Sequence, residues 1–418
     1  MRNPPNESDR PAPEAPGAPG LPAPDAPESR EEPGAPGKPA DFDREALARF
    51  KREKTLRIGS LELKNPFVLA PMAGLTNRPY RVLAAEFGAA LVFSEMASAV
   101  ALSRRGKGTL RLLENDKGEG SCPFGVQLFG KDPRTMAEAA KVAVFERGAD
   151  LIDLNFACPA RKVVRSGHGA ALLKDPGLAR SISGAVVKAV PVPVTVKTRP
   201  DFAPPPEGTD PLVLTLGKEL EEEGIAAITL HPRHATQAFG GVADWSLVER
   251  LAASVGIPVI GSGDIDGPVT ALKRLLNHGA TFAMLGRATR GRPWLFGECL
   301  ELYRGAERAG PASEPESGSR PTPGEKLPKT LALRLRTGVR HAELLRDYLG
   351  EKAVFPLRTI LTWYTRDLPG AAAFRNRIVR ESDIGRQLEI LAEALSFERV
   401  AESLRERQCG NPENDPAG

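Results

Sequence analysis

The sequence predicts an α/β protein, a (β/α)8 barrel of the TIM type followed by a small all-helical C-terminal domain. From Leu56 onward, short apolar runs alternate with helical stretches, which is the pattern of βα units around a parallel sheet. Eight such units fall within residues 55–303, close to the roughly 250 residues of a (β/α)8 barrel. After residue 331, apolar positions follow a helical period and no strand-like run occurs.

The eight expected strands are bounded by turn residues and contain mostly apolar side chains. They cover residues 66–72, 91–96, 125–129, 151–156, 192–199, 227–232, 258–262 and 282–286, with helices expected at 133–147, 178–189, 212–223, 245–253 and 269–278. A doubly wound sheet is the alternative. Such sheets more often carry a GxGxxG turn after the first strand, where this chain has Ala-Pro-Met-Ala-Gly.

The flanking segments differ from this core in composition. Residues 1–40 hold 12 prolines among Ala, Gly and acidic residues, so we expect residues 1–54 to be a disordered tail. A Pro, Gly and Ser-rich stretch at 304–330 is typical of a linker. The predicted organisation is therefore a barrel at 55–303, a helical domain at 331–408 and a short disordered tail at 409–418.

Composition excludes several classes of protein. No apolar run approaches the roughly 20 residues needed to span a bilayer, and the N-terminus lacks the regions of a signal peptide, so a cytoplasmic protein without membrane contact is expected. The four cysteines lie far apart with no CxxC pair, which indicates neither a disulfide framework nor a zinc site. The net charge of +4 is too small to indicate a partner by itself.

In barrels of this type, functional side chains come from the C-terminal ends of the strands. The first strand ends in Pro71-Met72-Ala73-Gly74, an apolar turn that lets backbone lie against a flat ring. The third supplies Gln127, which can both donate and accept hydrogen bonds. The fifth supplies Lys197, a cation suited to stabilising negative charge on a reduced flavin. For His231, at the end of the sixth, a structural role and a phosphate-binding role are equally compatible with the sequence.

Two glycine-containing loops follow the last two strands. The first contains Ser262, Gly263 and Asp264, and the second contains Gly286 and Arg287. Backbone N–H groups and an arginine at this place in a barrel commonly bind one phosphate dianion. A single phosphate site suits a mononucleotide better than a dinucleotide. The alternative is that these are turn glycines beside a surface arginine.

The fourth strand delivers Asn155 and Cys158 to a basic loop. The next residue, Pro159, fixes its own φ and restricts Cys158, so the thiol has a defined position. Free cysteines are most often small buried hydrophobes. Here the basic residues and two following glycines favour close approach of an anionic or planar ligand. The basic residues of the loop are Arg161, Lys162 and Arg165.

The first part of the helical region is strongly basic. Residues 329–380 contain eleven Lys or Arg against four Asp or Glu, a net charge of +7. The same stretch contains the aromatic residues Phe355, Trp363, Tyr364 and Phe374. Together these features predict a surface that holds nucleic-acid phosphates.

With these motifs assembled, the chain closely resembles the tRNA-dihydrouridine synthases, FMN enzymes that reduce particular uridines in tRNA. The resemblance covers about residues 56–404, and its ACPARKV and GRPWLF segments are most similar to the bacterial B-type subgroup. It rests on APMAG (70–74), SEM (94–96), LNFACPA (154–160), VKTR (196–199), HPR (231–233), GSGDI (261–265) and LGRATRGRPWLF (285–296).

The resemblance implies an activity and a set of roles. NADPH is expected to reduce FMN, and a D-loop uridine is then expected to be reduced at its C5=C6 bond, with Cys158 donating the proton. No obligate protein partner is indicated. The implied FMN contacts come from Pro71, Met72, Ala73, Gln127, Lys197, His231, Ser262, Gly263, Asp264, Gly286 and Arg287. The implied tRNA contacts come from Asn155, Arg161, Lys162, Arg165, Arg199 and the basic helical domain.

Three residues depart from the family pattern, namely Ala157, Ser262 and Ala235, where Gly, Asn and a cation are more usual. Two other functions stay open. An FMN-dependent dehydrogenase of a free pyrimidine would use similar chemistry, but a small substrate needs no basic helical domain. A non-catalytic tRNA-binding protein would not need Cys158, Lys197 and both phosphate loops.

Overall fold

The computed structural model describes residues 43–115, 122–305, 326–366, 368 and 370–395. Residues 1–42 of the expected tail, 306–325 of the expected linker, and 396–418 lie outside this part of the chain. The remainder of the expected linker is helical, because α11 (Leu295–Gly305) ends there and α12 (Lys326–Leu349) begins there.

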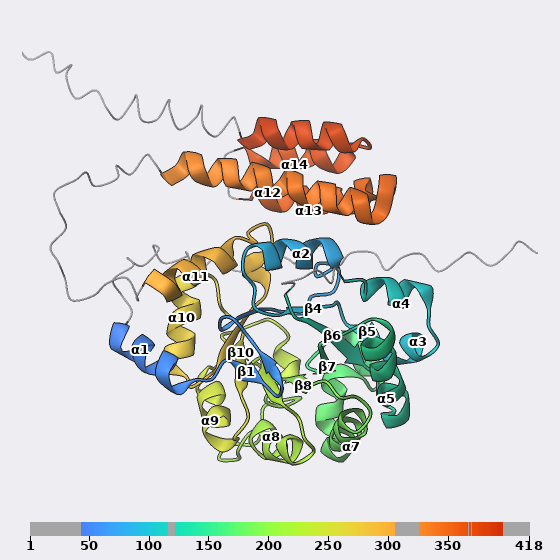
Figure 1. Ribbon diagram of the computed structural model, residues 1–418, viewed down its shortest axis with the longest axis vertical. Coiled ribbons are helices and arrows are strands. Elements are labelled where there is room, and N and C mark those ends of the chain that lie inside the picture. Colours follow the sequence, from blue (N-terminus) through green and yellow to red (C-terminus); the bar gives the residue numbers. More distant parts are fainter. Residues whose placement is uncertain (1–42, 116–121, 306–325, 367, 369, 396–418) are drawn as a thin grey trace, which may run out of the picture. The chain divides into compact units, whose positions relative to one another are not determined.

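The central element is a parallel barrel surrounded by helices (Figure 1). Its strands follow the order β3-β11-β10-β9-β8-β7-β6-β4, and β5 (Ala97–Ser98) pairs with β6. Two backbone hydrogen bonds close the barrel between β3 and the segment that leads into β4. They run from Leu69 N to Leu91 O and from Ala90 N to Phe67 O, both at 2.9 Å. The predicted barrel and its eight strands are confirmed. They are β3 (Phe67–Leu69), β4 (Val92–Phe93), β6 (Phe124–Phe129), β7 (Leu151–Phe156), β8 (Val194–Thr198), β9 (Ala227–Leu230), β10 (Val259–Ser262) and β11 (Phe282–Leu285).

Burial on both faces explains why these strands are nearly continuous apolar runs. All six residues of β7 are buried, including Asp153 and Asn155. The parallel register sets Gln127 of β6 beside Asp153, and Asn155 beside Lys197 of β8. The strand register therefore brings the predicted polar residues of three strands to one end of the barrel.

The outer helices begin with side-chain caps that the sequence supplies. Asp132 and Asp175 accept bonds from backbone N–H groups of α5 and α7, and both helices have Pro in the first turn. A π-helical turn, Val142–Glu146, continues α5. The helices are α2 (Arg78–Glu86), α3 (Ala99–Ser103), α4 (Lys107–Leu112), α5 (Pro133–Lys141), α6 (Arg161–Arg165), α7 (Pro176–Val187), α8 (Leu212–Glu222), α9 (Ser246–Ser254) and α10 (Pro268–Asn277).

The prediction that the disordered tail extends to residue 54 is wrong in its last part. Helix α1 (Arg44–Glu53) buries Ala46, Leu47 and Phe50, and Lys51 Nζ donates to the Tyr303 carbonyl at 2.9 Å. The physical reason is an apolar stripe at helical spacing with an Asp43 cap, which the low-complexity stretch before it lacks. A short hairpin, β1 (Arg57–Ile58) and β2 (Leu61–Glu62), then leads into the barrel.

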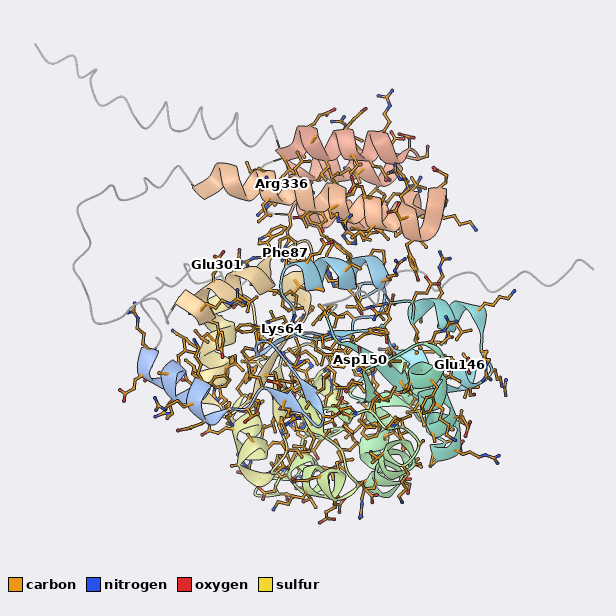
Figure 2. The ribbon with its side chains drawn as sticks, in the orientation of Figure 1. Lys64, Phe87, Glu146, Asp150, Glu301 and Arg336 are labelled. Atoms are coloured by element: carbon orange, nitrogen blue, oxygen red, sulfur yellow. The ribbon has the colours of Figure 1, made fainter. Side chains whose placement is uncertain are left out.

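The described residues of the C-terminal region form helices joined by short turns, as predicted. Elements α12, α13 (Val354–Tyr364) and α14 (Ala371–Arg380), with helical residues 384–395, enclose a core that includes Leu345, Leu361 and Leu391. Trp294, which precedes α11, is part of the same core. Its ring centroid lies 6.5 Å from that of Phe87, labelled in Figure 2. Within the described ranges, no helix combines the length and apolar character needed to cross a bilayer.

Removing the anchor of α1 should destabilise the protein. Phe50 is 6% exposed, so Phe50→Ala should lower the free energy of unfolding by about 3–5 kcal/mol. Phe145 is 65% exposed, so Phe145→Ala should change it by no more than about 0.5 kcal/mol. Urea titrations of both variants test this, and equal effects would mean that α1 does not pack on the barrel.

A buried histidine should make stability depend on pH. Burial lowers the pKa of His341 to about 3, whereas the pKa of a histidine in the unfolded chain is about 6.5. Between these values the unfolded chain binds the extra proton, so the free energy of unfolding falls with falling pH, by up to about 1.4 kcal/mol per pH unit. His341→Gln should lose this component when the two proteins are unfolded by urea between pH 6.5 and 4.5. Parallel pH curves would contradict a neutral buried imidazole.

Candidate active site

The Cys158 backbone is fixed by contacts from both sides of its loop. Asn155 Oδ1 accepts hydrogen bonds from the N–H groups of Ala157 at 3.1 Å and Cys158 at 2.9 Å. The N–H of Ala170 donates to the Cys158 carbonyl at 3.1 Å. Gly169 has φ +60°, and a Cβ there would lie 2.8 Å from the Cys158 carbonyl oxygen. The half-buried thiol therefore has a defined position after β7.

A buried chain of polar side chains crosses β6, β7 and β8. Gln127 Nε2 donates to Asp153 Oδ2 at 2.7 Å, and Asn155 Nδ2 donates to Gln127 Oε1 at 2.9 Å. Thr195 Oγ1 donates to the other carboxyl oxygen of Asp153 at 2.7 Å. These bonds fix which end of each amide is oxygen, so they orient Gln127 and, through Asn155, the Cys158 loop.

Asp153 was not among the predicted site residues. The sequence feature that could have identified it is an ionisable side chain inside the mostly apolar run LIDLNF. Such a side chain needs hydrogen-bond partners, because charged side chains are rarely fully buried without them. Burial raises the pKa of Asp153, and it lowers the pKa of Lys197 nearby. The positive charge of Lys197 acts in the opposite direction to burial and favours the carboxylate form of Asp153.

Positive charge accumulates at the ends of β8, β9 and β11. Burial, together with the charges of Lys197, Arg199, Arg233 and Arg287, lowers the pKa of His231 to about 2. His231 is therefore neutral at physiological pH, surrounded by cations. Such a concentration of positive charge in a partly enclosed site favours an anionic ligand.

The loop after β10 is held by an ion pair. Arg233, 3% exposed, donates through Nη2 to Asp264 Oδ2 at 2.9 Å, and the N–H of Ala243 donates to the same oxygen at 2.7 Å. Although burial opposes it, the hydrogen bond from Arg233 lowers the pKa of Asp264. Gly263, at φ +103°, lies under His231, where a Cβ would come within 2.7 Å of the imidazole Cδ2. Buried Ser262 ends β10 beside this turn.

The loop after β11 meets the turn after β3. A Cβ on Gly286 would contact Ala70 at 3.6 Å and the Met72 sulfur at 3.8 Å. Met72 is held in turn by Thr76, whose Oγ1 accepts from the Met72 N–H at 3.0 Å. Pro71 is half-buried and Ala73 is exposed. The structure thus brings the first-strand turn against Gly286, as the strand order requires.

One predicted phosphate contact, Arg199, needs correction. Arg199 is 1% exposed, and its guanidinium donates to the carbonyls of Ala157 and His234, both at 2.9 Å. Asn155 is 6% exposed, and its amide is used by Gln127 and the Cys158 loop. Arg199 therefore stabilises the loop from inside the protein and is not placed to bind a phosphate of RNA. The role of Asn155 as a substrate contact stays a prediction. In contrast, the side chains of Arg161, Lys162 and Arg165 are exposed on α6.

The arrangement combines a proton donor with a cationic, partly buried site. Burial raises the pKa of the Cys158 thiol, so it stays protonated at neutral pH and can act as a general acid. Among the side chains that the structure describes, no three His, Cys, Asp or Glu residues gather as ligands for a metal ion. The donor set of amide, cations and glycine turns instead fits a planar cofactor that carries a phosphate.

Comparisons with known proteins point to one family. Residues 68–400 match the family model described as dihydrouridine synthase. The chain is 37% identical over 333 residues to tRNA-dihydrouridine synthase B of Pseudomonas aeruginosa, covering 79% of this chain and 93% of the relative. It is 36% identical over 339 residues to tRNA-dihydrouridine synthase B of Escherichia coli K12, covering 80% and 98%. A probable tRNA-dihydrouridine synthase of Rickettsia bellii is 36% identical over 327 residues, covering 77% and 92%.

The buried position of Arg199 gives a stability prediction. Arg199→Ala leaves buried carbonyls without donors, so the free energy of unfolding should fall by at least about 2 kcal/mol. Arg161→Ala, on exposed α6, should change it by no more than about 0.5 kcal/mol. Chemical unfolding of the two variants tests the assignment, and a neutral effect of Arg199→Ala would restore Arg199 as a candidate surface contact.

Proposed function

This chain belongs to the dihydrouridine synthase family, and from that premise we propose that it is a tRNA-dihydrouridine synthase of the bacterial B type. In this proposal it reduces the C5=C6 bond of D-loop uridines in tRNA, with FMN as cofactor and NADPH as reductant. The observation that carries the proposal is Cys158, a protonated thiol held in place by Asn155 beside a cationic site. The proposed substrate places the reaction in the cytoplasm.

The residues at the strand ends fit FMN. The positive surroundings of neutral His231 suit the phosphate, with Arg287 and the turns at Gly263 and Gly286 as its ligands. Ser262 lies at the same turn, and Asp264 acts by holding it through Arg233. Pro71, Met72 and Ala73 provide the apolar turn for the flat ring. When bound, FMN supplies the hydride for the reduction.

Gln127 and Lys197 are the proposed partners of the polar edge of the ring. Gln127 is 2% exposed and its amide is oriented by Asp153. Lys197 is the neighbour of Asn155 in the β7–β8 register, which puts it beside the Cys158 loop. Burial and Arg199 disfavour its charged form, whereas negative charge on a ligand would favour it. Lys197 is therefore suited to a ligand whose negative charge increases on reduction.

Cys158 supplies the proton. The uracil gains hydride at C6, and a new C–H bond forms at C5 as the S–H bond of Cys158 breaks. The thiolate that remains recovers a proton from water. The raised pKa supports this role, because a thiolate at the start of the reaction would have no proton to donate.

The RNA contacts follow from exposure and charge. A uridine must leave its stack before it reaches Cys158, as in other enzymes that act on bases. Phosphate contacts position the RNA without reading sequence, and exposed Arg161, Lys162 and Arg165 on α6 are suited to this. The cations of residues 329–380 extend the proposed RNA surface onto the helical region.

The test of the function uses tRNA from cells that lack dihydrouridine. Expression of this protein should add two hydrogens to mapped D-loop uridines, detected by mass spectrometry. Cys158→Ser should lower the reduction rate by about 10²–10⁴-fold, because the general acid is lost, while FMN and tRNA binding remain. Cys122→Ser is the matched control, since the Cys122 thiol bonds to the Ala89 carbonyl away from the site.

Two outcomes would contradict the proposal. Full activity of Cys158→Ser would remove the proton-donor role. A folded protein that carries FMN yet leaves tRNA unmodified would shift the assignment to a free pyrimidine or to RNA binding without catalysis.

A further inference from the structure

The segment Gly286–Trp294, which we call the β11 loop, contains Arg287 and is built around Thr289. The N–H and the Oγ1 of Thr289 both donate to the Gly286 carbonyl at 2.9 Å. The Arg290 N–H donates to the Arg287 carbonyl at 3.1 Å. Thr289 is fully buried. The position of the Gly286–Arg287 backbone therefore depends on where Thr289 is held.

Thr289 is held by a side chain that also contacts the helical region. The Tyr80 hydroxyl, from α2, donates to the Thr289 carbonyl at 2.5 Å and lies 2.9 Å from its Oγ1. The Tyr80 ring lies 5.6 Å from the ring of His341 in α12. His341 Nδ1 lies 3.1 Å from the Tyr364 hydroxyl of α13. All four side chains are buried, so they form a continuous packed link from α13 to the β11 loop.

Three further residues of the β11 loop lie against the helical region. Gly291 has φ +67°, and a Cβ there would come within 2.6 Å of the Trp363 carbonyl oxygen, so backbone meets backbone. Trp294 is buried in the core formed by the C-terminal helices, with its ring 6.4 Å from that of Tyr364. The guanidinium of Arg290 lies 5.7 Å from the Trp363 ring. Thr289, Gly291 and Trp294 thus fix the loop at three points.

From these contacts we propose that the helical region supports the cofactor-phosphate site from outside it. It holds the β11 loop in the conformation in which Gly286 and Arg287 bind the phosphate of FMN, and it contributes no direct contact. Tyr80 and Gly291 are therefore positioning residues. The physical basis is preorganisation, since a loop that is already ordered loses less conformational freedom on binding. This inference rests on the proposed function, because it takes FMN as the ligand.

The test compares FMN with riboflavin, which has the same ring and no phosphate. Gly291→Ala should weaken FMN binding about ten-fold, because its Cβ would push the loop from Trp363, and should leave riboflavin binding unchanged. The matched controls are Gly208→Ala and Gly350→Ala. Both glycines have left-handed backbones, φ +76° and +61°, with no atom within 4 Å of an added Cβ. Titrations followed by flavin fluorescence give the FMN-to-riboflavin affinity ratio for each protein.

A second variant distinguishes the proposed effect on the β11 loop from a general folding defect. Tyr80→Phe keeps the ring against His341 and removes only the hydroxyl, so it should also lower the FMN-to-riboflavin affinity ratio, by about three-fold or more. An unchanged ratio in both Gly291→Ala and Tyr80→Phe, with wild-type protein binding FMN, would overturn this inference and leave the proposed function intact. Failure of folded wild-type protein to bind FMN would instead overturn the proposed function.

Discussion

A carboxyl group buried at the centre of the barrel constrains the whole site. Asp153 can be buried there because Gln127 and Thr195 donate to its oxygens, and an unpartnered carboxylate in such a place would be very costly. The Gln127 amide, once oriented by Asp153, presents its oxygen to Asn155, and Asn155 then accepts from the backbone of Cys158. The position of the thiol therefore depends on an acid that need not touch any substrate.

The two halves of the site follow opposite electrostatic rules. Around Cys158, burial keeps the thiol neutral and the amides paired. Around His231, four cations gather and lower its pKa, and Arg233 donates to the carboxylate of Asp264. An ionic ligand that brings negative charge relieves this repulsion, whereas a neutral ligand does not. The division suits one molecule with a flat, weakly polar part and an anionic end.

Much of the fold could be predicted because it depends on local pattern. Burial on both faces made each strand apolar, and alternation with helices fixed the barrel. Side-chain direction was harder to predict. Arg199 and Arg161 are both cations after strands, yet one is buried against carbonyls and the other is exposed. Helix α1 was missed because its short apolar stripe follows a long low-complexity stretch. The contacts of Tyr80 and Gly291 could not be predicted from the sequence, because they join segments that lie far apart in it.

Trp294 lies between the barrel and α11 in the sequence but packs in the core of the C-terminal helices. The protein is therefore not two interchangeable modules joined at residue 306. A chimera that took its helical region from a relative would have to recreate a cavity for this indole and a flat backbone surface for Gly291. Engineering a new RNA preference should accordingly treat residues 286–294 and the helices beyond them as one unit of exchange.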